Sequence, residues 1–119
     1  GIASNGCYDR LLKATRLAER IHGYILLKGH YSALCTPEGK VFFNPTGNAG
    51  MATAGSGDVL LGIITGLLAQ GYNPKDACLV GMYLHGLAGD LAVRDLGEES
   101  LLASDIITYL PKAFLRIRE

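Results

Sequence analysis

The most informative segment of the chain is Gly47-Asn48-Ala49-Gly50-Met51-Ala52-Thr53-Ala54-Gly55-Ser56-Gly57-Asp58-Val59-Leu60, a Gly-rich loop that runs into an apolar segment. Residues 58–70 are apolar nearly all round, which predicts a buried helix that begins at Asp58 and ends at Gly71. Glycines let backbone N–H groups approach a ligand closely, and the first turn of a helix leaves its N–H groups without intrahelical partners. Together they predict an anion site suited to a phosphoryl group.

Asp58 stands at the mouth of this predicted anion site. The loop lacks the Gly-Lys-Ser/Thr ending of a Walker A motif and the third glycine of a dinucleotide fingerprint. A carboxylate beside a phosphoryl group becomes a better proton acceptor, so Asp58 is a candidate general base for a substrate hydroxyl. The alternative is a plain N-cap aspartate after a Gly-rich turn, and the residues alone leave both interpretations open.

The remaining elements predict an α/β fold, because helical periodicity alternates with short apolar runs. Turn residues Pro37-Glu38-Gly39 predict a hairpin, and Asn73 with Pro74 predicts a helix start. Gly97 is expected to end that helix, and Pro111 is expected to kink or interrupt the last one. Helices are expected at residues 7–22, 58–70, 73–94 and 104–117, a buried strand at 24–27, and hairpin strands at 32–36 and 40–43.

Composition excludes several classes of function. The 119 residues contain eleven basic and eleven acidic side chains, so there is no electrostatic footprint for nucleic acid or for an anionic membrane. Three cysteines without a CxxC pair favour neither a zinc site nor a disulfide framework, which points to a reducing compartment, the cytoplasm. No apolar run reaches the roughly 18 residues of a membrane span.

Two further positions have a functional and a structural interpretation. Lys28 and Gly29 close the strand at 24–27, an edge where ligands bind in open α/β sheets, although the residues alone favour a solvent-exposed lysine. His85 lies on the helix predicted at 73–94, and Asp90 follows it by five residues, not the four that a helical metal pair needs. A partly buried histidine with a hydrogen-bond partner is therefore the favoured interpretation of His85.

Three blocks of the sequence resemble the ADP/ATP-dependent NAD(P)H-hydrate dehydratases, which are metabolite-repair enzymes with a ribokinase-like fold. The blocks are residues 44–60, Leu67-Leu68-Ala69-Gln70-Gly71 and Leu84-His85-Gly86-Leu87-Ala88-Gly89-Asp90, and Ala103-Ser104-Asp105 also matches. The resemblance implies that residues 1–119 are the C-terminal half of a ribokinase-like three-layer α/β/α domain, with the N-terminal half missing. It also implies a fragment of a longer protein, which in some relatives carries an upstream epimerase domain, and assembly as a homo-oligomer.

The resemblance also implies a chemistry. The family uses ADP or ATP to phosphorylate the ring hydroxyl of hydrated NADH or NADPH, and phosphate then leaves. Asp58 would contact the hydrate as catalytic base, and Gly55, Ser56 and Gly57 would form the anion hole. Family members use Mg²⁺, although no ligand set for it is evident here. The nucleotide would lie against Lys28, Gly29, His30, Tyr31, Ser32, Asn48, Gly50, Thr53 and Gly57.

The sequence departs from the family pattern at two places. His30-Tyr31-Ser32 stand where a small residue and a Thr usually follow Lys-Gly, and Ala54-Gly55 replaces a common glycine pair. Two alternatives therefore stay open. One is a small-molecule kinase of the same superfamily that acts on a vitamin or sugar, and the other is a non-catalytic nucleotide-binding or assembly module.

Overall fold

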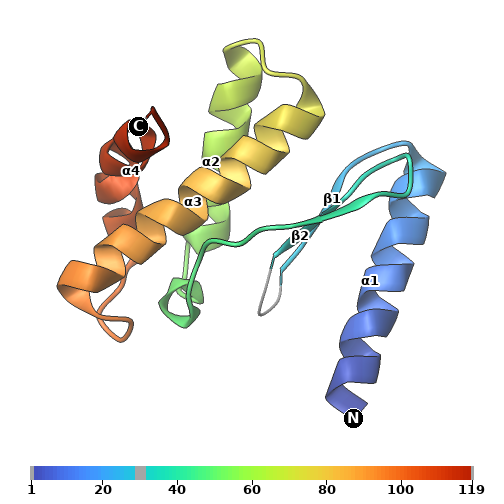
Figure 1. Cartoon of the computed structure of the whole chain (residues 1–119), viewed down its shortest axis with the longest axis horizontal. Helices are drawn as coiled ribbons and strands as arrows, with labels where there is room; N and C mark the ends of the chain where they lie inside the picture. Colours follow the sequence, from blue (N-terminus) through green and yellow to red (C-terminus); the bar gives the residue numbers. More distant parts are fainter. Residues whose placement is uncertain (1, 29–31, 119) are drawn as a thin grey trace. The chain divides into compact units, whose positions relative to one another are not determined.

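The computed structural model describes residues 2–28 and 32–118, and for residues 2–8 it describes the backbone alone. These residues form two compact units, Gly1–Phe43 and Asn44–Glu119 (Figure 1). Each unit has its own group of buried side chains, so the two are described separately. Within the described part of the chain, no helix is both long enough and apolar enough to cross a bilayer.

The first unit packs helix α1 (Ile2–Ile21) against a three-stranded antiparallel sheet. The strands β1 (Ile25–Leu27), β2 (Ala33–Cys35) and β3 (Val41–Phe43) lie in the order β1-β2-β3. Pro37-Glu38-Gly39 forms the turn of the β2–β3 hairpin, as predicted, with Gly39 at a φ of 84°. The buried centre of the unit consists of Ala14, Ala18 and Cys35.

Two expectations for this unit are wrong. The strand expected at 24–27 is only half-buried, because β1 lies at an edge of the sheet while β2 in the middle is fully buried. The helix expected from residue 7 begins at Ile2. Ser4, Asn5 and Gly6 carry no apolar repeat, so side-chain periodicity could not mark the start of this helix.

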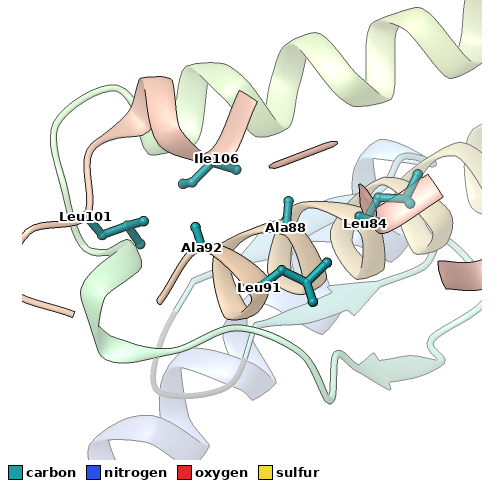
Figure 2. Packing of buried hydrophobic residues seen from close by; sticks show 7 residues of the cluster. Leu84, Ala88, Leu91, Ala92, Leu101 and Ile106 are labelled. Atoms are coloured by element: carbon teal, nitrogen blue, oxygen red, sulfur yellow. The ribbon is translucent and has the colours of Figure 1, made fainter. Parts of the chain in front are cut away.

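The second unit is built around helix α3 (Pro74–Leu96), which packs against both α2 (Ser56–Ala69) and α4 (Ala103–Arg118) (Figure 1). Figure 2 shows Ala88 and Ala92 of α3 on the side that faces Ile106 of α4. The buried cluster comprises Leu84, Ala88, Leu91, Ala92, Leu101, Ile106 and Ala113.

The ends of α3 confirm the predicted capping. The side-chain oxygen of Asn73 accepts a hydrogen bond of 2.9 Å from the N–H of Asp76, and Pro74 occupies the first turn. Gly97 ends the helix at a φ of 79°, where a side chain would be strained. The predicted break at Pro111 is wrong, since α4 continues through it. Pro111 removes one donor from the carbonyl of Ile107, on the exposed side of α4, where water can replace that donor.

Helix α2 differs from its prediction in two ways. It begins at Ser56, two residues before Asp58, and only part of it is buried. Leu60, Ile64 and Leu67 face the core, whereas Leu61 is 63% exposed and Leu68 is 42% exposed. The apolar pattern predicted burial all round, but in this chain neighbouring elements cover one side of the helix.

Candidate functional site

The backbone of Gly55 determines where α2 begins. Gly55 is the N-cap residue, with φ 87° and ψ −8°, a left-handed conformation that favours glycine. Ser56 and Gly57 are already helical, so Asp58 is the third residue of the helix rather than its cap. This position excludes the N-cap interpretation of Asp58. Its carboxylate is exposed and has no hydrogen bond or ion pair with any residue that the structure describes.

The backbone N–H groups of the first turn of α2 fall into two sets. The N–H of Ser56 donates to the carbonyl of Thr53 at 3.2 Å, and the N–H of Val59 donates to the carbonyl of Gly55 at 3.1 Å. Within residues 2–28 and 32–118, the N–H groups of Gly57 and Asp58 have no acceptor. These two donors, at the positive end of the helix dipole, are therefore available to an anion.

The side chain of Ser56 is directed into the unit and not toward the open N–H groups. Ser56 and His85 are both buried, and His85 Nε2 lies 3.2 Å from Ser56 Oγ and 3.0 Å from the Ser56 carbonyl oxygen. A carbonyl oxygen only accepts, so we assign the hydrogen to Nε2 and the donor role to His85. Of the three predicted anion-hole residues, Gly57 offers an N–H, Ser56 has partners for both its hydroxyl and its N–H, and Gly55 is the N-cap residue of α2.

The segment before the loop lies along α3. Asn44 Nδ2 donates to the carbonyl of Met82 at 2.9 Å, and Thr46 Oγ1 donates to the carbonyl of Tyr83 at 3.1 Å. Gly86 makes this close approach possible, because a Cβ there would lie 2.1 Å from Thr46 Oγ1. Gly86 therefore allows the segment before the loop to pack directly against α3.

Asp90 of α3 holds the start of the Gly-rich loop. Its two oxygens accept hydrogen bonds from the N–H of Gly47 at 3.0 Å and from Asn48 Nδ2 at 2.8 Å. Asn48 Oδ1 in turn accepts a bond of 3.0 Å from the N–H of Gly50, where the short helix η1 (Ala49–Met51) begins. Both polar atoms of the Asn48 side chain are thus used within the protein. Sequence reasoning missed this role of Asp90, since no local spacing connects it to the loop.

The other predicted nucleotide-binding residues are divided between the two units. Thr53, in the second unit, is half-buried beside α2 and accepts the Ser56 N–H. Lys28, in the first unit, is exposed after β1, and its carbonyl accepts a bond of 3.1 Å from Arg10 Nη2. Ser32 is half-buried before β2. Gly29, His30 and Tyr31 lie outside the described residues.

Comparison with known proteins identifies the family. Residues 3–112 match the Carb_kinase family model, described as NAD(P)H-hydrate dehydratase. A relative from Moorella thermoacetica, named bifunctional NAD(P)H-hydrate repair enzyme Nnr, is 48% identical over 111 residues, which are 93% of this chain and 21% of the relative. A relative from Bacillus subtilis, named ADP-dependent (S)-NAD(P)H-hydrate dehydratase, is 36% identical, and the match covers 87% of this chain and 37% of the relative.

Solved structures agree with the sequence comparison. The Bacillus subtilis ADP/ATP-dependent NAD(P)H-hydrate dehydratase, co-crystallised with ATP/Mg²⁺ and soaked with CoA, superposes with a TM-score of 0.85 at 36% identity. That match covers 90% of this chain and 40% of the dehydratase chain. A ribokinase-like superfamily protein from Enterococcus faecalis gives a TM-score of 0.62 over 83% of this chain and 35% of its own. The chain therefore belongs to the NAD(P)H-hydrate dehydratase family and has the α/β fold of part of a ribokinase-like domain.

Proposed function

We propose that this chain is the phosphoryl-handling part of an enzyme that repairs hydrated NADH or NADPH at the expense of ADP or ATP. The observation that carries the proposal is the exposed carboxylate of Asp58 beside the open N–H groups of Gly57 and Asp58, at the first turn of α2. The names of the relatives supply the substrate and the nucleotide. A carboxylate and two anion-binding donors at one helix start suit transfer of a phosphoryl group to a hydroxyl.

The reaction assigns a role to each of these groups. The ring hydroxyl of the hydrate attacks the terminal phosphorus of the nucleotide, the bond to the bridging oxygen breaks, and AMP or ADP leaves. Asp58 takes the hydroxyl proton, a role worth roughly 10²–10⁴-fold in rate. Phosphate then leaves the ring carbon, a proton leaves the neighbouring carbon, and the ring double bond of NAD(P)H is restored.

The N–H groups of Gly57 and Asp58 would bind the oxygens of the transferring phosphoryl group, and one such donor is worth about 10²–10³-fold in kcat. Gly55 would assist through the backbone conformation that starts the helix. Because the side chain of Asn48 is used within the loop, we propose that Asn48, Gly50 and Thr53 meet the nucleotide through their backbone.

The Bacillus subtilis dehydratase was co-crystallised with ATP/Mg²⁺. Among the described residues of this chain, no group of three His, Cys, Asp or Glu side chains could hold a metal ion. These residues do not fit a protein-held Mg²⁺ site. Mg²⁺ usually binds substrate phosphates and water with few protein ligands, so we expect any Mg²⁺ to arrive with the nucleotide.

The exposed apolar side of α2 bears on assembly. Leu61 and Leu68 are exposed large apolar side chains, and their spacing of seven residues puts them on one face of α2. We propose that residues 1–119 form one partial domain within a cytoplasmic homo-oligomeric protein. The relatives named bifunctional, of which the chain spans about a fifth, support a further epimerase domain in the parent protein. Sedimentation of the chain and of its Leu61→Lys variant tests the assembly, since the variant should sediment as a smaller species.

The decisive experiment measures recovery of NADH and NADPH from their hydrates with ADP and, separately, with ATP. Repair with either nucleotide supports the proposal and determines which nucleotide and which hydrate are used. Transfer of phosphate to a vitamin or sugar alcohol, without repair, would instead identify a small-molecule kinase. Calorimetric titration of the chain with ADP separates a third outcome, since binding without turnover would indicate a nucleotide-binding module.

A further inference from the structure

The contact between His85 and Ser56 joins the middle of α3 to the first residue of α2. Resting on the proposed function, we propose that His85 is a positioning residue for the phosphoryl-binding N–H groups of Gly57 and Asp58. His85 Nε2 donates to the carbonyl oxygen of Ser56 at 3.0 Å and contacts its Oγ at 3.2 Å. It thereby holds the helical turn that presents those two N–H groups.

Few hydrogen bonds from other elements hold the start of α2. Gly55 supplies no side-chain cap for the helix. Glycines stand on both sides of Ser56, and glycine loses more conformational entropy on folding than any other residue. The backbone bonds from Ser56 to Thr53 and from Val59 to Gly55 close the turn locally. Among the described residues, His85 is the side chain of another element that hydrogen-bonds to residues 52–59, while Val59 packs against the apolar core of the unit.

His85 itself is held on a rigid element. It lies on a helix of 23 residues and is 8% exposed, and the neighbouring Leu84 is fully buried. A displacement of the His85 side chain should therefore also displace Ser56, because tightly packed interiors transmit strain. The imidazole reaches Ser56 and not the open N–H groups, so its action is indirect. Misplacement of a binding group by 1 Å can cost about 10²-fold in rate.

Two amide variants form a matched pair that tests this role. In His85→Gln the side-chain amide reaches about as far as Nε2 and can still donate to the Ser56 carbonyl. In His85→Asn the same amide is too short to reach it, while polarity and hydrogen-bonding character are kept. The probe is inorganic phosphate, titrated into the labelled 119-residue chain while the amide signals of Gly57 and Asp58 are followed by NMR.

We expect phosphate to shift both amide signals in the wild-type chain and in His85→Gln. In His85→Asn the apparent dissociation constant should rise about tenfold, which is within the contribution of a helix terminus to anion binding. Unchanged signals of Leu101 and Ala113, in the core of the unit, would show that His85→Asn is folded. If His85→Asn does not fold, Ser56→Ala replaces it, since that variant removes the Oγ contact and should weaken phosphate binding by a smaller factor.

The outcomes separate this inference from the proposed function. Phosphate binding that is equal in His85→Asn and wild type, at the same two amides, would overturn the positioning role and leave the anion site intact. Equal weakening in His85→Gln and His85→Asn would overturn it as well, because reach would then not matter. No shift at Gly57 and Asp58 in the wild type would overturn the anion site and the positioning role together. In a protein that shows hydrate repair, His85→Asn should lower kcat with little change in the KM for nucleotide.

Discussion

Asp90 accepts a hydrogen bond of 2.8 Å from the side chain of Asn48, a residue 42 positions earlier in the chain. Its other oxygen accepts the N–H of Gly47, so one carboxylate of α3 holds the beginning of the Gly-rich loop. The end of the same loop is held by His85, five residues earlier on α3. Helix α3 is therefore the support on which the candidate phosphoryl site is built.

The role of Asp90 can be tested through stability. Asp90→Ala leaves the Gly47 N–H and Asn48 Nδ2 without their acceptor, which should cost about 1–3 kcal/mol in the free energy of unfolding. Asp90→Asn keeps one acceptor oxygen and should cost less. Urea denaturation measures both, with Glu99→Ala in an exposed loop as the control, expected within about 0.5 kcal/mol of wild type. Equal stability of Asp90→Ala and Glu99→Ala would contradict the assigned role.

The close approach of α3 to Thr46 predicts intolerance of any side chain at Gly86. A Cβ there would lie 2.7 Å from the backbone carbon of Thr46, so Gly86→Ala should destabilise by roughly 1–3 kcal/mol. Gly62→Ala on α2 is the matched control, since a Cβ there meets nothing within 4 Å. That variant should instead stabilise by about 0.5–1 kcal/mol through helix propensity. Thermal unfolding of the two variants should move in opposite directions.

Asp58 should matter for activity and little for folding. Its carboxylate is exposed and makes no hydrogen bond within the described chain, so Asp58→Asn should change stability by at most about 1 kcal/mol, the helix-dipole contribution. In a protein that shows hydrate repair, the same substitution should lower kcat roughly 10²–10⁴-fold. Steady-state kinetics measure the effect, with Glu99→Gln as the matched carboxylate control. Repair at the wild-type rate would exclude Asp58 as the base.

The hydrogen bond between Tyr109 and Asp95 should make the free energy of unfolding depend on pH in the alkaline range. The hydrogen bond from its hydroxyl to Asp95 raises the pKa of Tyr109 above the ordinary value of 10.0, with smaller contributions from desolvation and nearby carboxylates. The pKa of Tyr109 is higher in the folded protein than in the unfolded chain. The stabilisation that the Tyr109 hydroxyl contributes is therefore complete below pH 10 and is lost as pH rises through the pKa of the folded protein. The urea midpoint should therefore fall as pH rises above about 10, and less steeply in Tyr109→Phe. Identical pH profiles would show that the bond contributes nothing.

Features that depend on neighbouring residues could be predicted from the sequence. The turn at Pro37-Glu38-Gly39, the Asn73 cap and the Gly97 stop are all confirmed, because turn and cap chemistry acts over a few positions. The Gly-rich loop was correctly located before a helix, and His85 was correctly interpreted as a buried histidine with a partner.

Which polar groups of that loop remain without a partner among the described residues depends on how the helices pack. The start of α2 at Ser56, the one-sided burial of that helix, and the pairs Ser56–His85 and Asn48–Asp90 could not be predicted from local pattern. Residue periodicity records which side chains are apolar, but contacts across 29 and 42 positions exist only after the helices have packed. That packing engages Ser56 and Asn48 within the protein and leaves the N–H groups of Gly57 and Asp58 without a described partner.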